Sequence, residues 1–586
     1  MAIETEPEFV KRFGHPLFAS FDSTELTPFD VWRLSQQSRA TLNLRNSVDL
    51  FSSDIRFYSP DLVTPGREAV LSPLGAGVNW SKVIWNDRPW RDARTNRADL
   101  NLLPPMMIGS AESTTSGSID GEVGMGLQQV APVDAVSRQS LTSLHHRLGF
   151  YGFGPVEFIH LRPLSETSRI TLGGYFPSST GRFPPHSAYS GQTLWGRYAR
   201  DWKEGRRLAV MAMDGLHKVE SPYQVSRSNA HRNDIDAQYS ASLLALPMTA
   251  NIYRSETRYT TQPDKTYGRE LGLGIRLGDE RLSAKIRVVM KDGILGKGTD
   301  YAEEELSAVA STGRTFGDLS FTGSAGLEGL ISDDLHPVAG LRVAFASGQL
   351  TPFLKANQSV DAHSPEQRYA RYRSSTIEEP LEPLRVLNPN LPVKGHQIEA
   401  TLIRSAEIGA TTSLLRGTVT ASVFGWQEAH SAGWVLDGDT ALVWSNTIDR
   451  SAEGWLAEYR YNQGGWRGSV AATGMNRHGF VAVYDPEPPV RVVWEIGRHK
   501  FFYNNAFETD IVVSGKYFAS FNSIAEKPGE SLGGGFPIDA RFTAKISRFT
   551  FHYALHNLNG SKYSLIPGYR MMHKEEYWGV EWLLID

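Results

Sequence analysis

The sequence predicts an all-β protein: a transmembrane antiparallel β-barrel of about 22 strands with an N-terminal plug domain in its lumen. Three observations lead to this fold class. After about residue 140, short runs of alternating apolar and polar residues recur with turn residues between them. The connections between these runs tend to alternate between short and long. No stretch approaches the ~18 consecutive apolar residues of a membrane helix, so a membrane protein with this sequence must cross with strands.

The run 281–291 illustrates the alternation. Charged and small polar residues occupy one face of a pleated strand over this run, and apolar residues occupy the other. The runs 539–546 and 548–556 repeat the pattern and predict a hairpin that turns near Ser547. We expect the apolar residues of such runs to face lipid, and representative positions are Leu282, Ile286, Val288, Phe549, Phe551, Tyr553, Trp578 and Trp582.

Alternation alone does not separate a membrane barrel from a soluble sandwich, because the apolar face points outward in one and inward in the other. The rhythm of the connections decides between them. Outer-membrane barrels pair short periplasmic turns with longer external loops, and an even number of strands returns the chain to the side where the barrel began. The predicted short connections are 202–205, 278–280, 312–315, 347–349 and 462–465, and the predicted long ones are 177–189, 219–231, 361–393, 478–495, 522–535 and 558–572.

The first 142 residues differ from the rest of the chain. They alternate less and contain more loop-forming residues, including the small, polar stretch 110–118. A barrel of about 22 strands encloses a lumen too wide for its own side chains to fill, and barrels of that size are plugged. A compact plug in a hydrated lumen tolerates such polarity. We therefore predict a plug domain over 1–142 and a barrel over 143–586.

Composition and motifs exclude several classes of function. The formal charge of -4 leaves no overall basic surface for nucleic acid. The absence of cysteine excludes disulfide scaffolds, thiolate metal sites and a cysteine nucleophile. The sequence contains no hydrolase elbow, no phosphate-binding loop and no zinc-protease helix motif. We expect no enzymatic activity, no cofactor, no metal site and no nucleic-acid partner.

The C-terminal part of the chain carries the most specific motifs. Asn388–Pro392 precedes a predicted strand, and Trp444–Tyr461 covers a long strand. The chain ends with Asn557-Leu558-Asn559, then Pro567-Gly568-Tyr569, and then a strand that contains Gly579, Trp582 and Leu584. These motifs resemble those of the TonB-dependent outer-membrane receptors, plugged barrels that import scarce nutrients with energy passed from the inner membrane. The final strand is also similar to the signal read by the barrel-assembly machinery.

The plug resembles that family less closely. Val83–Trp90 is similar to the family's apex strand and turn, and Asp99–Pro104 is similar to its Asp-Leu-x-x-Ile-Pro element. The segments 108–115 and 121–126 depart from the family pattern, and no TonB-box strand is found between Met1 and Phe29. The resemblance implies a bacterial outer-membrane location, with outer-membrane lipid, a TonB-type energy-coupling protein and other envelope or surface proteins as partners. The start of the chain lacks a secretory signal, which we expect to have been removed.

Two clusters of arginines and aromatic residues are candidate substrate-binding sites. By resemblance the first lies at the plug apex, and the second falls in the longest predicted external loop. Guanidinium groups beside aromatic rings suit carboxylate, phosphate or catecholate-like ligands. The alternative is that the arginines form ion pairs with acids at the plug–barrel interface, which is the more frequent fate of such clusters. The candidates are Arg88, Trp90, Arg91, Arg94 and Arg97 in the plug, and Arg368, Tyr369, Arg371, Tyr372 and Arg373 in the loop.

The sequence therefore predicts an outer-membrane receptor or transporter that binds and imports a small solute without transforming it. A second interpretation is a non-transporting plugged barrel that anchors other proteins of an outer-membrane assembly, because the plug motifs are altered. A third is a soluble all-β carbohydrate-active enzyme, which requires the alternating apolar faces to point inward. The strand number and the position of the apolar faces discriminate among these interpretations.

Overall fold

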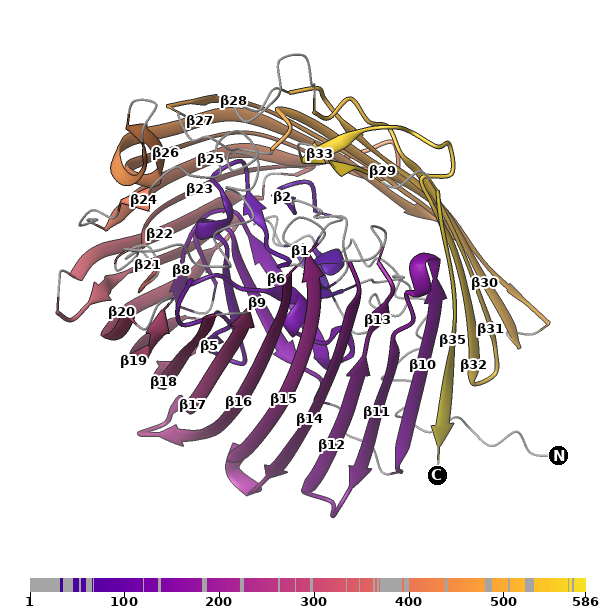
Figure 1. The fold of residues 1–586 in the computed structure, drawn as a ribbon, viewed down its shortest axis with the longest axis horizontal. Coiled ribbons are helices and arrows are strands. Elements are labelled where there is room, and N and C mark those ends of the chain that lie inside the picture. Colours follow the sequence, from indigo (N-terminus) through magenta and orange to yellow (C-terminus); the bar gives the residue numbers. More distant parts are fainter. Residues whose placement is uncertain are drawn as a thin grey trace.

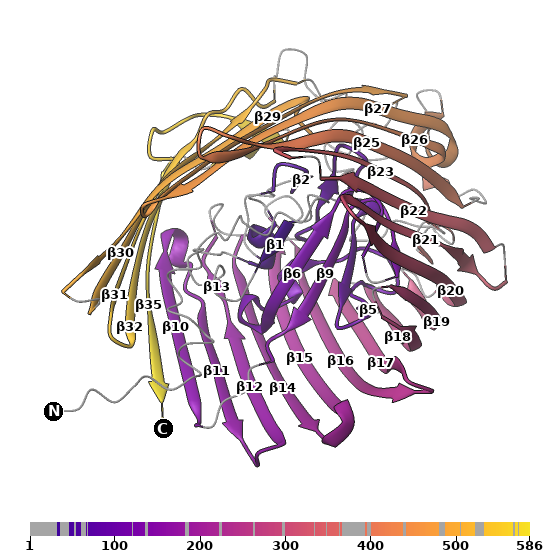
Figure 2. The ribbon, with the colours of Figure 1, turned by 180° about the vertical axis from the view of Figure 1, so that it is seen from behind.

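The chain forms a closed barrel around an inner sheet (Figures 1 and 2). No helix among the described residues has the length and apolar character needed to cross a membrane. The computed structural model describes residues 32–34, 46–51, 54–59, 66, 68–119, 121–134, 139–181, 187–221, 226–261, 264–279, 281–295, 299–332, 335–346, 348–361, 364–365, 368, 393–394, 400–437, 441–479, 487–503, 506–521, 532–566, 569–571 and 574–585.

The barrel closes where its first strand meets its last. β10 (Leu141–Gly149) pairs with both β11 (Val156–Pro163) and β35 (Glu575–Ile585). The short segments β13 (Ser178–Ser179) and β24 (Val393–Lys394) are additions beside the ring, since β12 pairs directly with β14 and β23 with β25. The described residues thus form a closed antiparallel barrel of 22 strands, which confirms the predicted fold class and strand number.

The other strands of the ring follow one another in chain order. They are β12 (Ser168–Phe176), β14 (Tyr189–Asp201), β15 (Arg207–Ser221), β16 (Ser226–Leu243), β17 (Leu246–Thr261), β18 (Asp264–Gly278), β19 (Leu282–Leu295), β20 (Thr299–Phe316), β21 (Leu319–Leu330), β22 (Leu335–Phe345), β23 (Leu350–Asp361), β25 (Thr401–Leu414), β26 (Gly417–Asp437), β27 (Ala441–Gln463), β28 (Trp466–His478), β29 (Val490–Phe502), β30 (Phe507–Phe518), β31 (Ile538–Ile546) and β32 (Phe549–His556).

The apolar faces of the strands point outward. Ile286 is 55% exposed and Trp582 is 52% exposed, whereas Lys285 and Arg287 on the opposite face of the same strand as Ile286 are buried. Of the eight representative positions, six have exposed side chains and Phe551 and Tyr553 are half-buried on the same outer face. A soluble core would hide these residues, so the predicted lipid-facing surface is confirmed and the soluble-enzyme interpretation is wrong.

The two ends of the barrel differ as predicted. Tight turns such as 244–245, 415–416 and 464–465 lie at one end, together with the barrel termini Leu141 and Ile585. The longest connections, including 362–400 and 519–537, lie at the other end. Short turns mark the periplasmic side of such barrels, so we refer to the long-loop end as external.

Some strand boundaries differ from the prediction. The connection 219–231 is not a long loop, because β15 and β16 stay paired as far as Ser221 and Ser226. The strand predicted to follow Asn388–Pro392, at about 394–405, begins instead at Thr401 and continues to Leu414. Around 219–231 polar residues occupy both faces of the strands, because the ladder extends there beyond the lipid-facing belt. The alternation fades there although the backbone pairing continues.

A five-stranded sheet lies inside the ring, with the strand order β1-β6-β9-β4-β5 (Figure 2). The altered segment 108–115 still supplies the strand β6, which pairs with β1 and β9. The strands inside the ring are β1 (Trp32–Leu34), β2 (Phe57–Tyr58), β3 (Ser72–Pro73), β4 (Lys82–Trp85), β5 (Arg88–Pro89), β6 (Ile108–Thr114), β7 (Ser118–Ile119), β8 (Glu122–Val123) and β9 (Leu127–Pro132).

Short elements complete the described chain. The hairpin β33 (Ser564–Ile566) and β34 (Tyr569–Arg570) lies in the external connection between β32 and β35. The 3-10 helices are η2 (Ser47–Leu50), η3 (Val78–Trp80), η4 (Leu100–Leu102), η5 (Pro105–Met107), η6 (Phe150–Gly152) and η7 (Lys203–Gly205).

Candidate ligand site at the plug–barrel interface

The tip of the β4–β5 hairpin contacts the barrel wall. Asn86 and Asp87 form its turn with φ of 50° and 66°, a left-handed conformation that Asn and Asp adopt more readily than most residues. Asn86 Nδ2 donates to Asp236 Oδ1 at 2.8 Å, and Gln238 Nε2 donates to Asp87 Oδ2 at 2.9 Å. Both of these partners lie on β16, and Asn251 Nδ2 of β17 donates to the backbone carbonyl oxygen of Asp87 at 3.1 Å, so this turn is fixed to two neighbouring strands of the wall.

Arg88 follows the turn and is fully buried. Its guanidinium lies 3.1 Å from a carboxylate oxygen of Asp234 and 3.7 Å from one of Asp236. The guanidinium of Arg232 stacks over the buried ring of Trp90, 3.8 Å from the ring centre, and donates to Asp234 at 2.7 Å. Two arginines from different parts of the chain therefore share one carboxylate beside the Trp90 indole.

Arg91 lies at the next contact with the wall. Its Nε donates to Glu270 Oε1 at 2.6 Å, and its Nη2 donates to Glu305. Glu305 also accepts a hydrogen bond from Lys291 Nζ, which in turn donates to Asn96 Oδ1 at 2.6 Å. The Arg91 side chain is 18% exposed, so it is less enclosed than Arg88.

Arg94 and Arg97 also face acids. Arg94 donates to both carboxylate oxygens of Asp92, at 3.2 and 3.1 Å, and its guanidinium carbon lies 4.1 Å from the centre of the Tyr259 ring. Arg97 Nη1 lies 3.3 Å from Glu68 Oε2. All four plug arginines therefore have carboxylate partners, the geometry expected of the ion-pair alternative. Their role in binding a substrate stays a prediction.

The second predicted cluster falls mostly outside the described residues. Arg368 is described, and its Nη1 lies 3.4 Å from Glu303 Oε1 on the lumen face of β20. Tyr369, Arg371, Tyr372 and Arg373 lie outside the described residues, so the structure does not relate them to the plug apex.

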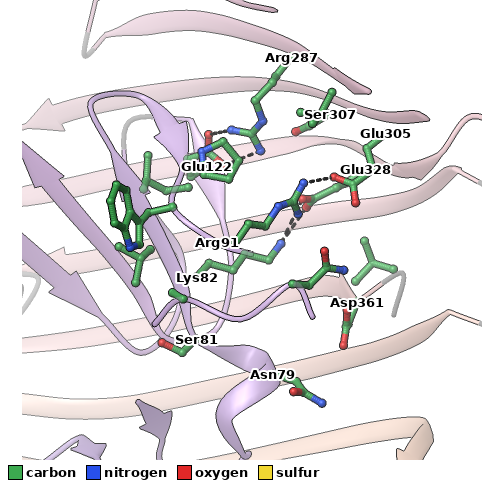
Figure 3. Close-up of a pocket in the computed structure, with 18 of the residues that line it drawn as sticks. Asn79, Ser81, Lys82, Arg91, Glu122, Arg287, Glu305, Ser307, Glu328 and Asp361 are labelled. Atoms are coloured by element: carbon green, nitrogen blue, oxygen red, sulfur yellow. Dashed lines mark hydrogen bonds and ion pairs between the residues drawn. The ribbon is translucent and has the colours of Figure 1, made fainter. Parts of the chain in front are cut away.

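A cavity of about 80 Å³ lies between the plug apex and the barrel wall formed by β19, β20, β21 and β23. Arg91, Lys82 and Arg287 extend toward Glu305, Glu328 and Glu122 around it (Figure 3). The volume suits a few water molecules at ~30 Å³ each. Asp361, the last residue of β23, also lines the cavity, which places it toward the external end.

Sequence reasoning identified Arg91 and Trp90 of this cavity and missed its other charged residues. Alternation along β19 does predict that Arg287 faces away from lipid. The partner of Arg287 is Glu122, which lies 165 positions earlier in a plug segment without a recognisable motif. No local pattern connects two residues that far apart, because their contact depends on how the plug sits in the ring.

Glu122 is a strongly stabilised carboxylate of the cavity. It is 6% exposed and lies 2.8 Å from Lys285 Nζ, and it accepts hydrogen bonds from Arg287. Burial alone would raise the pKa of this carboxyl, but the two cations outweigh burial and lower the pKa from 4.5 to about 2. Glu122 is therefore charged at every physiological pH and joins β8 of the plug to β19.

Asp99 of the plug shows the opposite behaviour. Burial, reinforced by the nearby carboxylate of Glu68, raises the pKa of Asp99 to about 8. The backbone N–H groups of Ala69 and Asn101 donate to its Oδ1 at 3.0 and 2.9 Å and oppose this shift. Asp99 also caps the helix η4, so a largely neutral carboxyl holds this turn of the plug.

Three arginines surround Asp134, which follows β9 near the start of the barrel. Arg169 Nη2 and Arg197 Nη1 lie 2.9 and 2.7 Å from Asp134 Oδ1, and Arg207 pairs with Oδ2. These arginines come from β12, β14 and β15, so three barrel strands hold the segment that joins the inner sheet to the ring.

A different contact holds the plug to the wall formed by β25, β26, β27 and β28. The indole Nε1 of Trp426 donates to the carbonyl oxygen of Leu74 at 2.9 Å, inside an apolar cluster. This apolar-wall cluster consists of Leu74, Ala76, Trp80 and Met125 of the plug with Ile403, Phe424, Trp426, Ala452 and Met475 of the barrel.

No known protein-family model matches this sequence, and no curated protein matches it. Solved structures do match. The siderophore receptor PirA from Pseudomonas aeruginosa aligns with a TM-score of 0.71 and 12% identity, over 94% of this chain and 99% of that one. The FrpB iron transporter from Neisseria meningitidis aligns with a TM-score of 0.73 and 11% identity, over 92% and 96%. The copper transporter OprC gives a TM-score of 0.77 and 10% identity, over 94% and 99%.

The chain has the fold of the TonB-dependent outer-membrane receptors. The alignment extends over nearly the whole chain, so it includes the inner sheet as well as the ring. The exposed apolar belt of this chain agrees with the outer-membrane barrels that have this fold. The three matched proteins are named as a siderophore receptor, an iron transporter and a copper transporter. Among the described residues, no group of three or more His, Asp or Glu side chains is arranged to hold a metal ion.

Proposed function

We propose that the chain is an outer-membrane receptor that binds a small solute at the external side of its plug and admits it to the periplasm, with residues 1–142 acting as the plug. The observation that carries this proposal is the fold, which this chain shares with a siderophore receptor, an iron transporter and a copper transporter over 92% or more of its length. A small cavity between the plug apex and β19–β23 marks where the two bodies meet toward the external end. Its lining comes from both bodies, with Lys82 and Arg91 on the plug and Glu328 and Asp361 on the barrel. A solute bound over the external side of this cavity would contact both bodies and would thus sense their relative position.

Energy coupling is a second part of the proposal. A plug joined to the wall by buried ion pairs such as Arg88–Asp234 will not move aside spontaneously, because separating the pair takes the carboxylate away from the buried Arg88 guanidinium in a poorly hydrated site. Work from outside the barrel is needed. We propose that a TonB-type protein supplies it from the periplasmic side.

The first solutes to test follow from the proteins that share the fold. Their names include siderophore receptors, an iron transporter and a copper transporter. A chelate brings its own metal ligands, so it needs none from the lining of the cavity, where the cations Lys82, Arg91 and Arg287 are paired with glutamates. We therefore propose a chelate of a transition metal as the solute class.

The test measures accumulation of radioactive iron, supplied as ferric enterobactin, and of radioactive copper in cells that have this chain as their only receptor of this fold. We expect energy-dependent accumulation of one of them, abolished by a protonophore or by loss of the TonB-type protein. Lys82→Gln combined with Asp361→Asn should reduce it at least tenfold, because both side chains line the cavity. Arg269→Gln, on the outer face of β18, is the matched control and should leave uptake unchanged.

One observation favours a second function, a sealed barrel that anchors other envelope proteins. Arg88 and Arg94 at the plug apex are fully buried and paired with acids, so these two arginines are not presented to a solute. For a sealed barrel we expect no energy-dependent accumulation of any metal chelate and no ion conductance in a planar bilayer. A stable partner protein should then co-purify in stoichiometric amount.

A further inference from the structure

The outer surface of the barrel carries a notch of about 370 Å³ across β27, β28 and β29. Gly468 of β28 lies at its centre, paired with Tyr461 on one side and Ile496 on the other. Because these three positions lie on the same face of the sheet, the missing side chain of Gly468 leaves a gap between its neighbours. A Cβ at Gly468 would meet only the carbonyl oxygen of Glu495, at 3.5 Å, so the gap is open to the outside.

The walls of the notch are apolar. Trp466, Val470 and Ile496 have side chains that are 46%, 43% and 50% exposed, and Tyr459 and Tyr461 complete the border. Trp466 follows the tight turn 464–465, which places the notch at the periplasmic end of the barrel. Indole and phenol rings at this level are typical of the boundary between acyl chains and headgroups.

Cations lie on the periplasmic side of the notch. The guanidinium carbon of Arg498 lies 4.7 Å from the centre of the Trp466 ring, and its Nη1 donates to the carbonyl oxygen of Gly464 at 3.1 Å. Two further cations near the notch are exposed. Arg416 lies in the adjacent turn 415–416, and Lys500 lies on β29 two positions beyond Arg498. The acid next to Ile496 on β29, Glu495, points to the opposite face of the strand, where its side chain pairs with Arg467 at 3.4 Å.

We propose that this notch is a binding site for an anionic glycerophospholipid of the periplasmic leaflet. One acyl chain would fill the gap at Gly468, and the phosphate would lie against Arg498, with Arg416 and Lys500 adding to the positive potential. Charge complementarity selects the occupant, because an apolar groove below a basic rim matches an acyl chain attached to an anionic headgroup. The stacking of Arg498 on Trp466 holds the guanidinium at the rim before the lipid arrives.

The test uses the full chain reconstituted in nanodiscs of equal parts phosphatidylglycerol and phosphatidylcholine, then extracted into mild detergent. Native mass spectrometry counts the phospholipids retained per barrel. We expect one phosphatidylglycerol on the wild-type protein. Gly468→Leu, which fills the gap, and Arg498→Gln, which removes the rim cation, should each lower its retention at least tenfold.

Gly425→Leu is the matched control. Gly425 also lies on the outer surface, on β26, and its Cβ would meet only the carbonyl oxygen of Ala452, at 3.6 Å. This variant should retain lipid as the wild type does, and heat-modifiable gel mobility should show that all variants fold. Equal retention of phosphatidylglycerol by the Gly468→Leu and Gly425→Leu proteins would overturn the proposal. Equal retention of phosphatidylcholine and phosphatidylglycerol by the wild type would also overturn it, since no anionic selectivity would remain.

Discussion

The plug contacts several parts of the barrel wall, and two of these contacts have different chemistry. On the wall of β16–β21, charged side chains of the plug meet buried charges, as in Arg88–Asp234 and Lys285–Glu122. On the wall of β25–β28, the plug residues Leu74 and Trp80 pack against an apolar surface that includes Phe424. Figures 1 and 2 show the inner sheet between these two walls.

The difference in chemistry predicts how each contact responds to substitutions and to pH. A buried ion pair contributes little relative to an apolar pair of the same shape, but removal of one partner is costly because the other charge stays buried. An apolar contact loses stability in proportion to the cavity that a truncation leaves. We therefore refer to the ionic wall (β16–β21) and the apolar wall (β25–β28), and expect pH to affect only the first.

The largest effect should follow from Glu122→Gln on the ionic wall. Lys285 and Arg287 are 6% exposed each and would lose the carboxylate that they share. We expect the plug to be destabilised by ~3–5 kcal/mol, as when one partner of a buried pair is removed. Hydrogen exchange of the segment 118–123 in the folded barrel measures the change. If its protection factors stay at the wild-type level, Glu122 does not hold the plug to β19.

Truncation on the apolar wall should have a similar or smaller effect. Ile403 is fully buried in the apolar-wall cluster, so Ile403→Ala should destabilise the plug contact by ~2–5 kcal/mol. Ile403→Val removes one methylene and should cost about 0.5–1.5 kcal/mol. Urea-dependent proteolysis of the plug inside the intact barrel measures both. A loss that changes between pH 5 and pH 9 would contradict the apolar character of this wall.

The response to alkali should isolate Asp99 within the plug. The unfolded pKa of a carboxyl is about 3.9, and the folded pKa of Asp99 is about 8. Between these two pH values the folded protein keeps a proton on Asp99 that the unfolded chain has lost. The contribution of Asp99 to the free energy of unfolding is therefore fully present below about pH 4 and is lost as pH rises through 8. Asp99→Asn keeps an acceptor for Ala69 N–H and should remove this pH dependence. If the wild-type plug and the Asp99→Asn plug are cleaved at equal rates both at pH 6 and at pH 9, Asp99 ionises normally.

The smallest effect should come from an ion pair of good geometry that faces outward. Arg269 donates to both carboxylate oxygens of Asp292, at 2.8 and 2.6 Å, but the two side chains are 46% and 38% exposed. Water screens such a pair, so Arg269→Gln should change stability by about 0.2–1 kcal/mol. Comparing the stability losses of Arg269→Gln and Glu122→Gln separates the effect of burial on an ion pair from the effect of hydrogen-bond geometry. A loss as large as that of Glu122→Gln would mean that geometry, and not burial, sets the strength of these pairs.

The strands of this barrel could be predicted because lipid imposes a strict rule on one face. Every outward position in the belt must be apolar, so residues such as Ile286 and Trp582 reveal strand, face and register together. Outside the lipid-facing belt, outward positions do not have to be apolar. The connection 219–231 contains paired strand residues up to Ser221 and Ser226, which sequence alone presents as a loop because both faces are polar there.

The candidate site was less predictable for a different reason. The arginine cluster at the plug apex could be found from the sequence, because its residues are close together in the chain. The ion-pair alternative follows from the general tendency of arginines to pair with acids. The identity of each partner could not be found, because Arg88 meets Asp234 across 146 positions and Glu122 meets Arg287 across 165. Such pairs are fixed by the rotation and depth of the plug in the lumen, and neither leaves a periodic signal in the sequence.

The closing seam has a consequence for how the protein is made. β10 completes its hydrogen bonds with β35, from Leu141 opposite Ile585 to Gly149 opposite Tyr577. The two strands lie at opposite ends of the barrel sequence, so the seam is the contact with the greatest loop-closure entropy in the ring. Until β35 has been synthesised and delivered, β10 has an open edge that invites wrong pairing. Folding of this barrel cannot proceed in step with synthesis. It must wait for the last residues of the chain, and a truncation of the final strand should leave a protein that aggregates and never enters the membrane.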